Sequence, residues 1–194
     1  MKLLLFAAVV FVTIFFAASC FGQINRAFVE SQIQKWRQQV ANDPRDYETL
    51  AAIGSAYGKL GNHALASDYF EKAIAVNPSY QPAYLGLGTS EGFLHHPEKA
   101  ISALRRAVEL KPTDYFALAK LGTTLGKTGD YAGAVMQLRR AVELKPDFVD
   151  AHFALGLAYL SSGDRSDATN EAKVLDRLDR SQASQLKNLI EQSR

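Results

Sequence analysis

The side chains in this sequence best suited to chemistry are four histidines and one cysteine. His63 and His152 stand alone, His95 and His96 are adjacent, and Cys20 lies near the N-terminus. A catalytic or zinc site needs several such groups, or a pair of carboxylates, at spacings that let them converge. We find no such spacing, so the sequence predicts no catalytic residue, no metal site and no cofactor.

These histidines have structural interpretations instead. His152 stands where a large apolar residue would be expected, which predicts a histidine packed in the core. His95 and His96 come just before Pro97, a residue that suits the first position of a helix. We therefore expect the adjacent pair to lie in a solvated turn.

Two arginine pairs form a basic ladder on the predicted outer helices. In each pair the first arginine, Arg105 or Arg139, has a glutamate four residues later, Glu109 or Glu143. Opposite charges at this spacing neutralise one another on a helix surface. The ladder therefore predicts a solvated face.

Charge and composition narrow the function classes. The 22 Lys and Arg residues nearly balance 20 Asp and Glu, the formal net charge is +2, and no basic block stands out. A nucleic-acid partner is therefore not expected. Hydrophobic residues make up 47% of the 194 residues, which suits one sizeable core, and a single cysteine excludes an internal disulfide framework.

The elements that must position these residues repeat along the sequence with one fixed period. Residues 105–112, Arg-Arg-Ala-Val-Glu-Leu-Lys-Pro, recur letter for letter at 139–146, 34 residues later. The same spacing separates four prolines, Pro44, Pro78, Pro112 and Pro146. A fixed period of this length indicates an array of stacked repeats.

Each unit of the array predicts a pair of helices. In the third unit Leu118, Leu121 and Leu125 share one helix face, and a Gly-Asp pair at 129–130 then breaks the helix. A second apolar stripe follows and ends at Pro146. The array is expected to span residues 44–182, in units 47–80, 81–114, 115–148 and 149–182, the last one degenerate. Segments 24–43 and 183–194 predict an N-terminal and a C-terminal capping helix.

Four glycines fall in the middle of the predicted first helices, at Gly54, Gly88, Gly122 and Gly156. Glycine in a helix interior costs about 1 kcal/mol relative to alanine. Small residues on the facing helices, Ala66, Ala100, Ala134 and Ala168, suggest the reason. We expect the two backbones of each hairpin to approach closely at these positions.

The order of small and large residues resembles the tetratricopeptide repeat. In the first unit it runs Gly54, Tyr57, Gly61, Ala66, Phe70, Ala73 and Pro78, and the third unit echoes it. The second unit departs from the pattern with Glu91 for the aromatic residue and His95 for the glycine. The resemblance implies an all-α fold, a right-handed α-solenoid of stacked helix-turn-helix hairpins.

In tetratricopeptide arrays the first helices line a concave groove that binds a protein or peptide partner. Carried over residue by residue, the resemblance places these side chains in the groove: Lys59, Leu85, Thr89, Phe116, Lys120, Thr123, Lys127, Phe153 and Leu157. The carboxylate clamp of the chaperone-binding members is absent, because only Lys120 of its residues remains. We therefore expect mainly apolar contacts, with the lysines orienting an acidic segment. The alternative for the aromatic residues is that they pack between neighbouring first helices.

The N-terminus predicts export. Lys2 precedes an uncharged apolar run over residues 3–18, so residues 1–22 fit a signal peptide. Three outcomes stay open: cleavage, lipidation at Cys20, and retention as a membrane tether through residues 3–20. The expected location is periplasmic or secreted, or alternatively membrane-anchored.

Two function classes fit these expectations. The first is a non-enzymatic adaptor that binds a peptide or protein partner in the groove. The second is a structural scaffold subunit of an envelope or membrane-associated assembly, held by its N-terminal segment and using its convex face.

Overall fold

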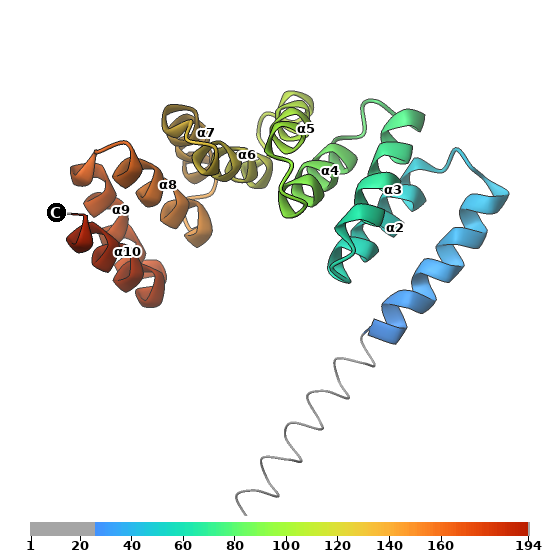
Figure 1. Ribbon diagram of the computed structural model, residues 1–194, viewed down its shortest axis with the longest axis horizontal. Coiled ribbons are helices and arrows are strands. Elements are labelled where there is room, and N and C mark those ends of the chain that lie inside the picture. Colours follow the sequence, from blue (N-terminus) through green and yellow to red (C-terminus); the bar gives the residue numbers. More distant parts are fainter. Residues whose placement is uncertain (1–25, 194) are drawn as a thin grey trace, which may run out of the picture.

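The computed structural model describes residues 26–193, and this part of the chain is helical with no strand. A helix over residues 26–42 is followed by nine more. These are α2 Tyr47–Lys59, α3 His63–Val76, α4 Gln81–Phe93, α5 Pro97–Leu110, α6 Tyr115–Lys127, α7 Tyr131–Leu144, α8 Val149–Ser161, α9 Arg165–Leu178 and α10 Arg180–Gln192. They follow one another along a curved array (Figure 1), so the predicted all-α, right-handed solenoid is confirmed.

The curvature follows from which helices touch. Each first helix contacts the next first helix, in the order α2, α4, α6, α8 and α10. The second helices α3, α5, α7 and α9 contact their own partners and the following first helix, but not one another. The first helices therefore form the inner, concave layer and the second helices the outer, convex layer.

Short polar side chains begin most of these helices. Asp46, Asn62, Asp114, Asp130, Asp164 and Asp179 each accept a hydrogen bond from a first-turn amide. The amide of Thr49 holds the pKa of Asp46 below its ordinary value. Gly61, Gly129 and Gly163 end first helices with φ of 78°, 88° and 88°, a left-handed conformation that glycine adopts without strain. In the second hairpin His95 takes this conformation, with φ of 60°.

The mid-helix glycines do allow close approach. A Cβ on Gly122 would lie 2.6 Å from Cγ of Leu138 and 3.0 Å from the carbonyl oxygen of Ala134. A Cβ on Gly88 would lie at the same two distances from Cγ of Leu104 and from the carbonyl oxygen of Ala100. A side chain at either position would therefore push the two helices of the hairpin apart.

Gly156 has a different neighbour from the one predicted. Leu186 of α10 approaches it most closely, ahead of any side chain of its own hairpin. The reason is that Ala172 stands where the other units have Phe70, Leu104 and Leu138. Leu186, which is completely buried, fills the space that the smaller residue leaves.

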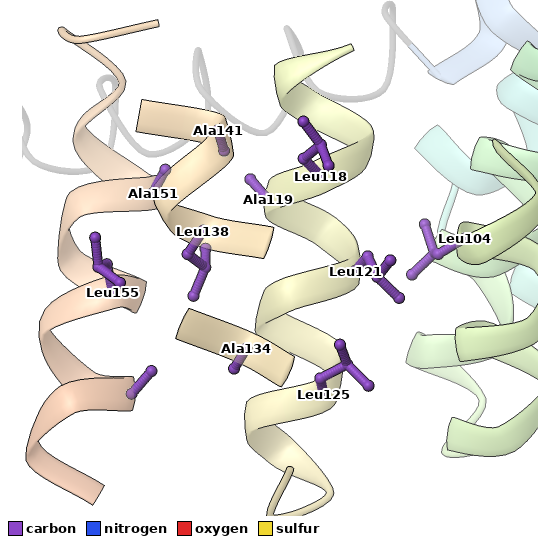
Figure 2. Close-up of a cluster of buried hydrophobic side chains, with 11 residues drawn as sticks. Leu104, Leu118, Ala119, Leu121, Leu125, Ala134, Leu138, Ala141, Ala151 and Leu155 are labelled. Atoms are coloured by element: carbon purple, nitrogen blue, oxygen red, sulfur yellow. The ribbon is translucent and has the colours of Figure 1, made fainter. Parts of the chain in front are cut away.

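Buried leucines and alanines form a core that runs from one repeat to the next. In Figure 2, Leu121 of α6 and Leu104 of α5 lie toward one another, and Leu138 of α7 lies between α6 and α8. At the N-terminal end, Ile33 is 3% exposed and packs with Ile53 and Ala56. Trp36 packs against that cluster.

The C-terminal cap starts earlier than expected. Asp179 is both the C-cap of α9 and the N-cap of α10, so a single residue separates the two helices. Its Oδ1 accepts from the amides of Ser181 and Gln182 at 2.8 and 3.1 Å. The Gln182 side chain donates to Asp150 at 3.3 Å and does not complete a capping box.

None of the helices within residues 26–193 has the length and apolar character needed to cross a membrane. The predicted export segment and Cys20 lie outside the described residues.

Candidate functional site

Two adjoining hollows lie against the first helices of the array. The smaller has a volume of about 110 Å³, and α4, α5 and α6 form its walls. It is lined by Gly88, Thr89, Gly92, Phe93, Leu104, Lys120, Thr123, Thr124 and Lys127. Four of the predicted groove residues, Thr89, Lys120, Thr123 and Lys127, therefore meet in this hollow.

The larger hollow, of about 260 Å³, lies between α6, α7 and α8. It is lined by Gly122, Thr123, Gly126, Lys127, Tyr131, Ala134, Leu138, Ala154, Leu157, Ala158 and Ser161. Thr123 and Lys127 line both hollows, so the two adjoin across α6. We call six of the side chains that line these two hollows the groove strip: Thr89, Phe93, Lys120, Thr123, Lys127 and Leu157.

The charge of the groove strip is positive. Lys120 and Lys127 are the only charged side chains that line either hollow, and within residues 26–193 neither forms an ion pair. The Lys120 ammonium lies 5.1 Å from the ring centroid of Phe116. Phe116 is 41% exposed and stacks on Phe148 at 6.2 Å. The strip thus offers cations beside exposed aromatic surface.

Other predicted groove residues lie elsewhere. Lys59 is exposed at the end of α2 and lines neither hollow. Leu85 packs against the central core cluster, and Phe153 packs against the cluster formed by α8, α9 and α10. Packing between helices therefore describes the contacts of Leu85 and Phe153, while Leu157 both packs on the C-terminal cluster and lines the larger hollow.

Tyr131 belongs to the larger hollow although the predicted set omitted it. The prediction considered first helices only, whereas Tyr131 begins the second helix α7. Its place directly after the Gly-Asp turn at 129–130 was the available signal. Phe93 stacks on His63 at 4.2 Å and is 60% exposed at the rim of the smaller hollow.

A third hollow, of about 780 Å³, lies on the outer layer between α3 and α5, above α4. Its rim is charged, with Glu71, Glu98, Lys99, Arg105, Arg106 and Glu109. The ion pair predicted between Arg105 and Glu109 is wrong, because Arg106 holds Glu109 at 2.9 Å through the i,i+3 spacing. Neither does Arg139 pair with Glu143 in the described part, while Arg140 donates to the carbonyl of Pro112 at 3.3 Å.

A buried carboxylate beneath this hollow was not predicted. Glu91 is 3% exposed and accepts hydrogen bonds from Ser67 Oγ at 2.5 Å and His96 Nδ1 at 2.7 Å. Burial alone would raise the pKa of Glu91, but these two bonds and the charge of Lys99 together lower it. The signal was a matched pair of departures, Glu91 in place of an aromatic residue and Ser67 where the second and third units have Ile101 and Val135. His95 and His96 are exposed as predicted, although the His96 ring is held by Glu91.

His152 is buried, as predicted, at 6% exposure. Its Nδ1 lies 2.7 Å from Glu171 Oε2 and its Nε2 lies 2.9 Å from the carbonyl oxygen of Pro146. Both ring nitrogens face acceptors, so the protonated imidazolium satisfies both bonds. The Glu171 bond, opposed by burial, raises the pKa of His152 above its ordinary value. Across residues 26–193 no three His, Cys, Asp or Glu side chains are placed to hold a metal ion.

Comparison with known proteins supports the resemblance seen in the sequence. Models of the family "Tetratricopeptide repeat" match residues 47–80 and 81–114, and a model described as "TPR repeat" matches residues 127–163. No curated protein matches the sequence.

Solved structures share the fold. A crystal structure of MamA is 27% identical with a TM-score of 0.72, covering 78% of this chain and 89% of MamA. YrrB, described as a TPR protein with an unusual peptide-binding site, is 26% identical with a TM-score of 0.73, covering 84% of each chain. TTC0263, a thermophilic TPR protein in Thermus thermophilus, is 21% identical with a TM-score of 0.64, covering 85% of this chain and 90% of TTC0263.

Proposed function

Because this chain belongs to the tetratricopeptide repeat family, we propose that it is a non-enzymatic adaptor that binds a protein or peptide partner in its concave groove. The observation that carries this proposal is the groove strip. Its side chains line two adjoining hollows of about 110 and 260 Å³, one on each side of α6. Hollows of this size accept individual side chains of an extended segment rather than a folded domain.

The similarity to YrrB supports a peptide as the partner. That protein is described as having a peptide-binding site, and its fold matches this chain over most of its length. In this chain the exposed ring of Phe93 lines the smaller hollow, and the exposed ring of Phe116 lies beside the Lys120 ammonium. Exposed aromatic residues beside a hollow are the usual anchors of a binding surface.

We place this activity outside the cytoplasm as part of the same proposal. Its support is the apolar run over residues 3–18 behind Lys2. Fractionation and N-terminal sequencing test it: we expect a chain beginning near Gln23, a lipid on Cys20, or a membrane-bound full-length chain. A soluble cytoplasmic protein that keeps Met1 would contradict export.

The alternative is a scaffold subunit that uses its convex face. The charged hollow of about 780 Å³ between α3 and α5 favours this alternative, since it offers a second surface to an assembly partner. Met136 on α7 is 60% exposed and lines a neighbouring outer hollow with Arg105 and Arg140. The two functions therefore predict contacts on opposite layers.

Substitutions on the two layers test the proposal. Phe93→Ala with Phe116→Ala changes exposed groove residues, and Arg105→Ala with Arg139→Ala changes the outer layer. We expect the groove variant to capture clearly less partner from an envelope extract while circular dichroism shows an intact helical fold. Loss of capture only in the arginine variant would refute the groove and favour the scaffold.

A further inference from the structure

We infer that the groove strip recognises one acidic side chain next to one apolar side chain in an extended segment of its partner. The smaller hollow takes the carboxylate, and the larger hollow takes the apolar group. This inference rests on the proposed function and names the class of partner that fits the groove.

The smaller hollow has the size and the donors for a carboxylate. Its volume of about 110 Å³ corresponds to only a few waters, each of which occupies about 30 Å³ in the liquid. The charged residues that line it are Lys120 and Lys127. The Thr123 hydroxyl makes no hydrogen bond within residues 26–193, whereas Thr89 and Thr124 donate to helix carbonyls at 2.8 Å. Thr123 therefore adds a neutral donor between two cations.

These three donors lie along one face of α6. Lys120, Thr123 and Lys127 are spaced by three and four residues, so they form one stripe. Seven residues of helix rise about 10.5 Å, and a lysine stem is long enough for both ammonium groups to meet near Thr123. One carboxylate held there would satisfy both cations at once, and no carboxylate of the described chain fills that role.

The larger hollow has the chemistry for an apolar side chain. Ala154, Leu157 and Ala158 of α8 form one wall, and Leu138 of α7 contributes to another. Thr123 and Lys127 line both hollows, so the carboxylate and the apolar group must be neighbours in the bound segment. In an extended chain side chains two residues apart point the same way and lie about 7 Å apart. An acidic residue with an apolar residue two positions away fits this arrangement.

The acidic side chains at the N-terminal ends of α2 and α8 lie away from this position. Glu48 and Asp150 are in the first turns of α2 and α8. Lys127 is in the last turn of α6, at the opposite end of the layer. Asp150 also accepts a hydrogen bond from Gln182 at 3.3 Å. The acidic residue of the partner is therefore directed toward the C-terminal ends of the first helices, where Lys127 lies.

A positional-scanning library of extended octapeptides tests this inference. Peptides amidated at the C-terminus are presented to the wild-type protein and to the variant Lys120→Gln/Lys127→Gln. A matched control, Lys72→Gln/Lys111→Gln, removes the same charge outside the groove strip. A parallel library with free C-termini shows whether a terminal carboxylate can take the place of the side chain.

We expect the wild-type protein and the control to enrich Asp or Glu with an apolar residue two positions away. The groove variant should lose the acidic preference and keep the apolar one. Enrichment of apolar peptides without any acidic preference would overturn the inference and leave peptide binding intact. Enrichment only among free C-termini would overturn the side-chain assignment, and no enrichment in either library would count against the proposed function itself.

Discussion

Two buried polar networks within residues 26–193 each hold an ionisable group at a junction between helices. His152 joins α8 to Glu171 of α9 and to the carbonyl of Pro146 in the preceding linker. Glu91 joins α4 to Ser67 of α3 and to His96 at the start of α5. A buried polar group is costly when one of its partners is removed, so both networks should affect stability more than their size suggests.

The His152 network predicts a pH dependence of stability. Because the pKa of His152 is raised in the folded state, its contribution is complete below the ordinary value of about 6.5. It is lost as the pH rises through the folded-state pKa. The free energy of unfolding of the wild type should therefore exceed that of His152→Gln by about 1–3 kcal/mol at low pH, and less at high pH. Urea unfolding of both proteins at several pH values measures this difference. A difference that grows with pH would show that the imidazole is buried neutral.

The Glu91 network predicts non-additive substitutions. Ser67→Val alone leaves the buried carboxylate with one donor fewer, and we expect a loss of about 1–3 kcal/mol. Glu91→Leu alone leaves the Ser67 hydroxyl buried without its acceptor. The double substitution gives an apolar pair like Ile101 and Leu125, which occupy the equivalent positions one repeat later, and should cost less than the sum. A double-mutant cycle by chemical denaturation checks the coupling, and strictly additive losses would contradict the network.

At the scale of helices, small residues set how closely each pair packs. Gly88 and Gly122 let a leucine and a backbone carbonyl of the second helix approach. In the last unit the arrangement changes, because Ala172 leaves a space that Leu186 of α10 fills. The C-terminal helix is therefore an integral part of the core.

Two glycine substitutions should have opposite effects. Gly122→Ala would place Cβ 2.6 Å from Leu138 Cγ, and we expect overpacking to destabilise the protein by about 1–3 kcal/mol. Gly92→Ala is the control, since its Cβ would meet nothing within 4 Å. The better helix propensity of alanine should stabilise this variant by up to about 1 kcal/mol. Thermal unfolding of both variants is the measurement, and equal shifts would refute the close approach.

Two leucines of α10 test its role as a cap. Leu186 is completely buried and Leu189 is 39% exposed, although they lie on the same helix within one turn. We expect Leu186→Ala to cost about 2–5 kcal/mol through the cavity it leaves, and Leu189→Ala to cost much less. Similar losses in urea unfolding would mean that α10 does not pack as described.

At the scale of the whole molecule, the sequence predicted the fold best where the same short-range pattern of residues recurs in every unit. The 34-residue period, the helix breaks and the capping residues depend on nearby residues, so the helix pairs and the solenoid could be predicted. Features that depend on contacts between units could not be predicted from the sequence. The Gly156 to Leu186 contact and the early start of α10 both follow from how α9 and α10 pack, which no periodicity encodes.

The candidate site was predictable in part for the same reason. Family positions indicated Thr89, Lys120, Thr123 and Lys127, and these four side chains line one hollow. They did not distinguish Phe116, which is 41% exposed, from Leu85 and Phe153, which pack into core clusters. That distinction depends on the size of residues in neighbouring helices, as does the contribution of Tyr131 from a second helix.

Photo-crosslinking tests the central claim, partner binding on the inner layer, most directly. Phe93 on the groove strip and Met136 on the outer layer are both 60% exposed, so a photoreactive phenylalanine can replace either residue without disturbing the core. We expect the probe at position 93 to form a specific crosslink with the partner, and the probe at position 136 to form none. A crosslink only from position 136 would contradict the claim and assign binding to the convex face.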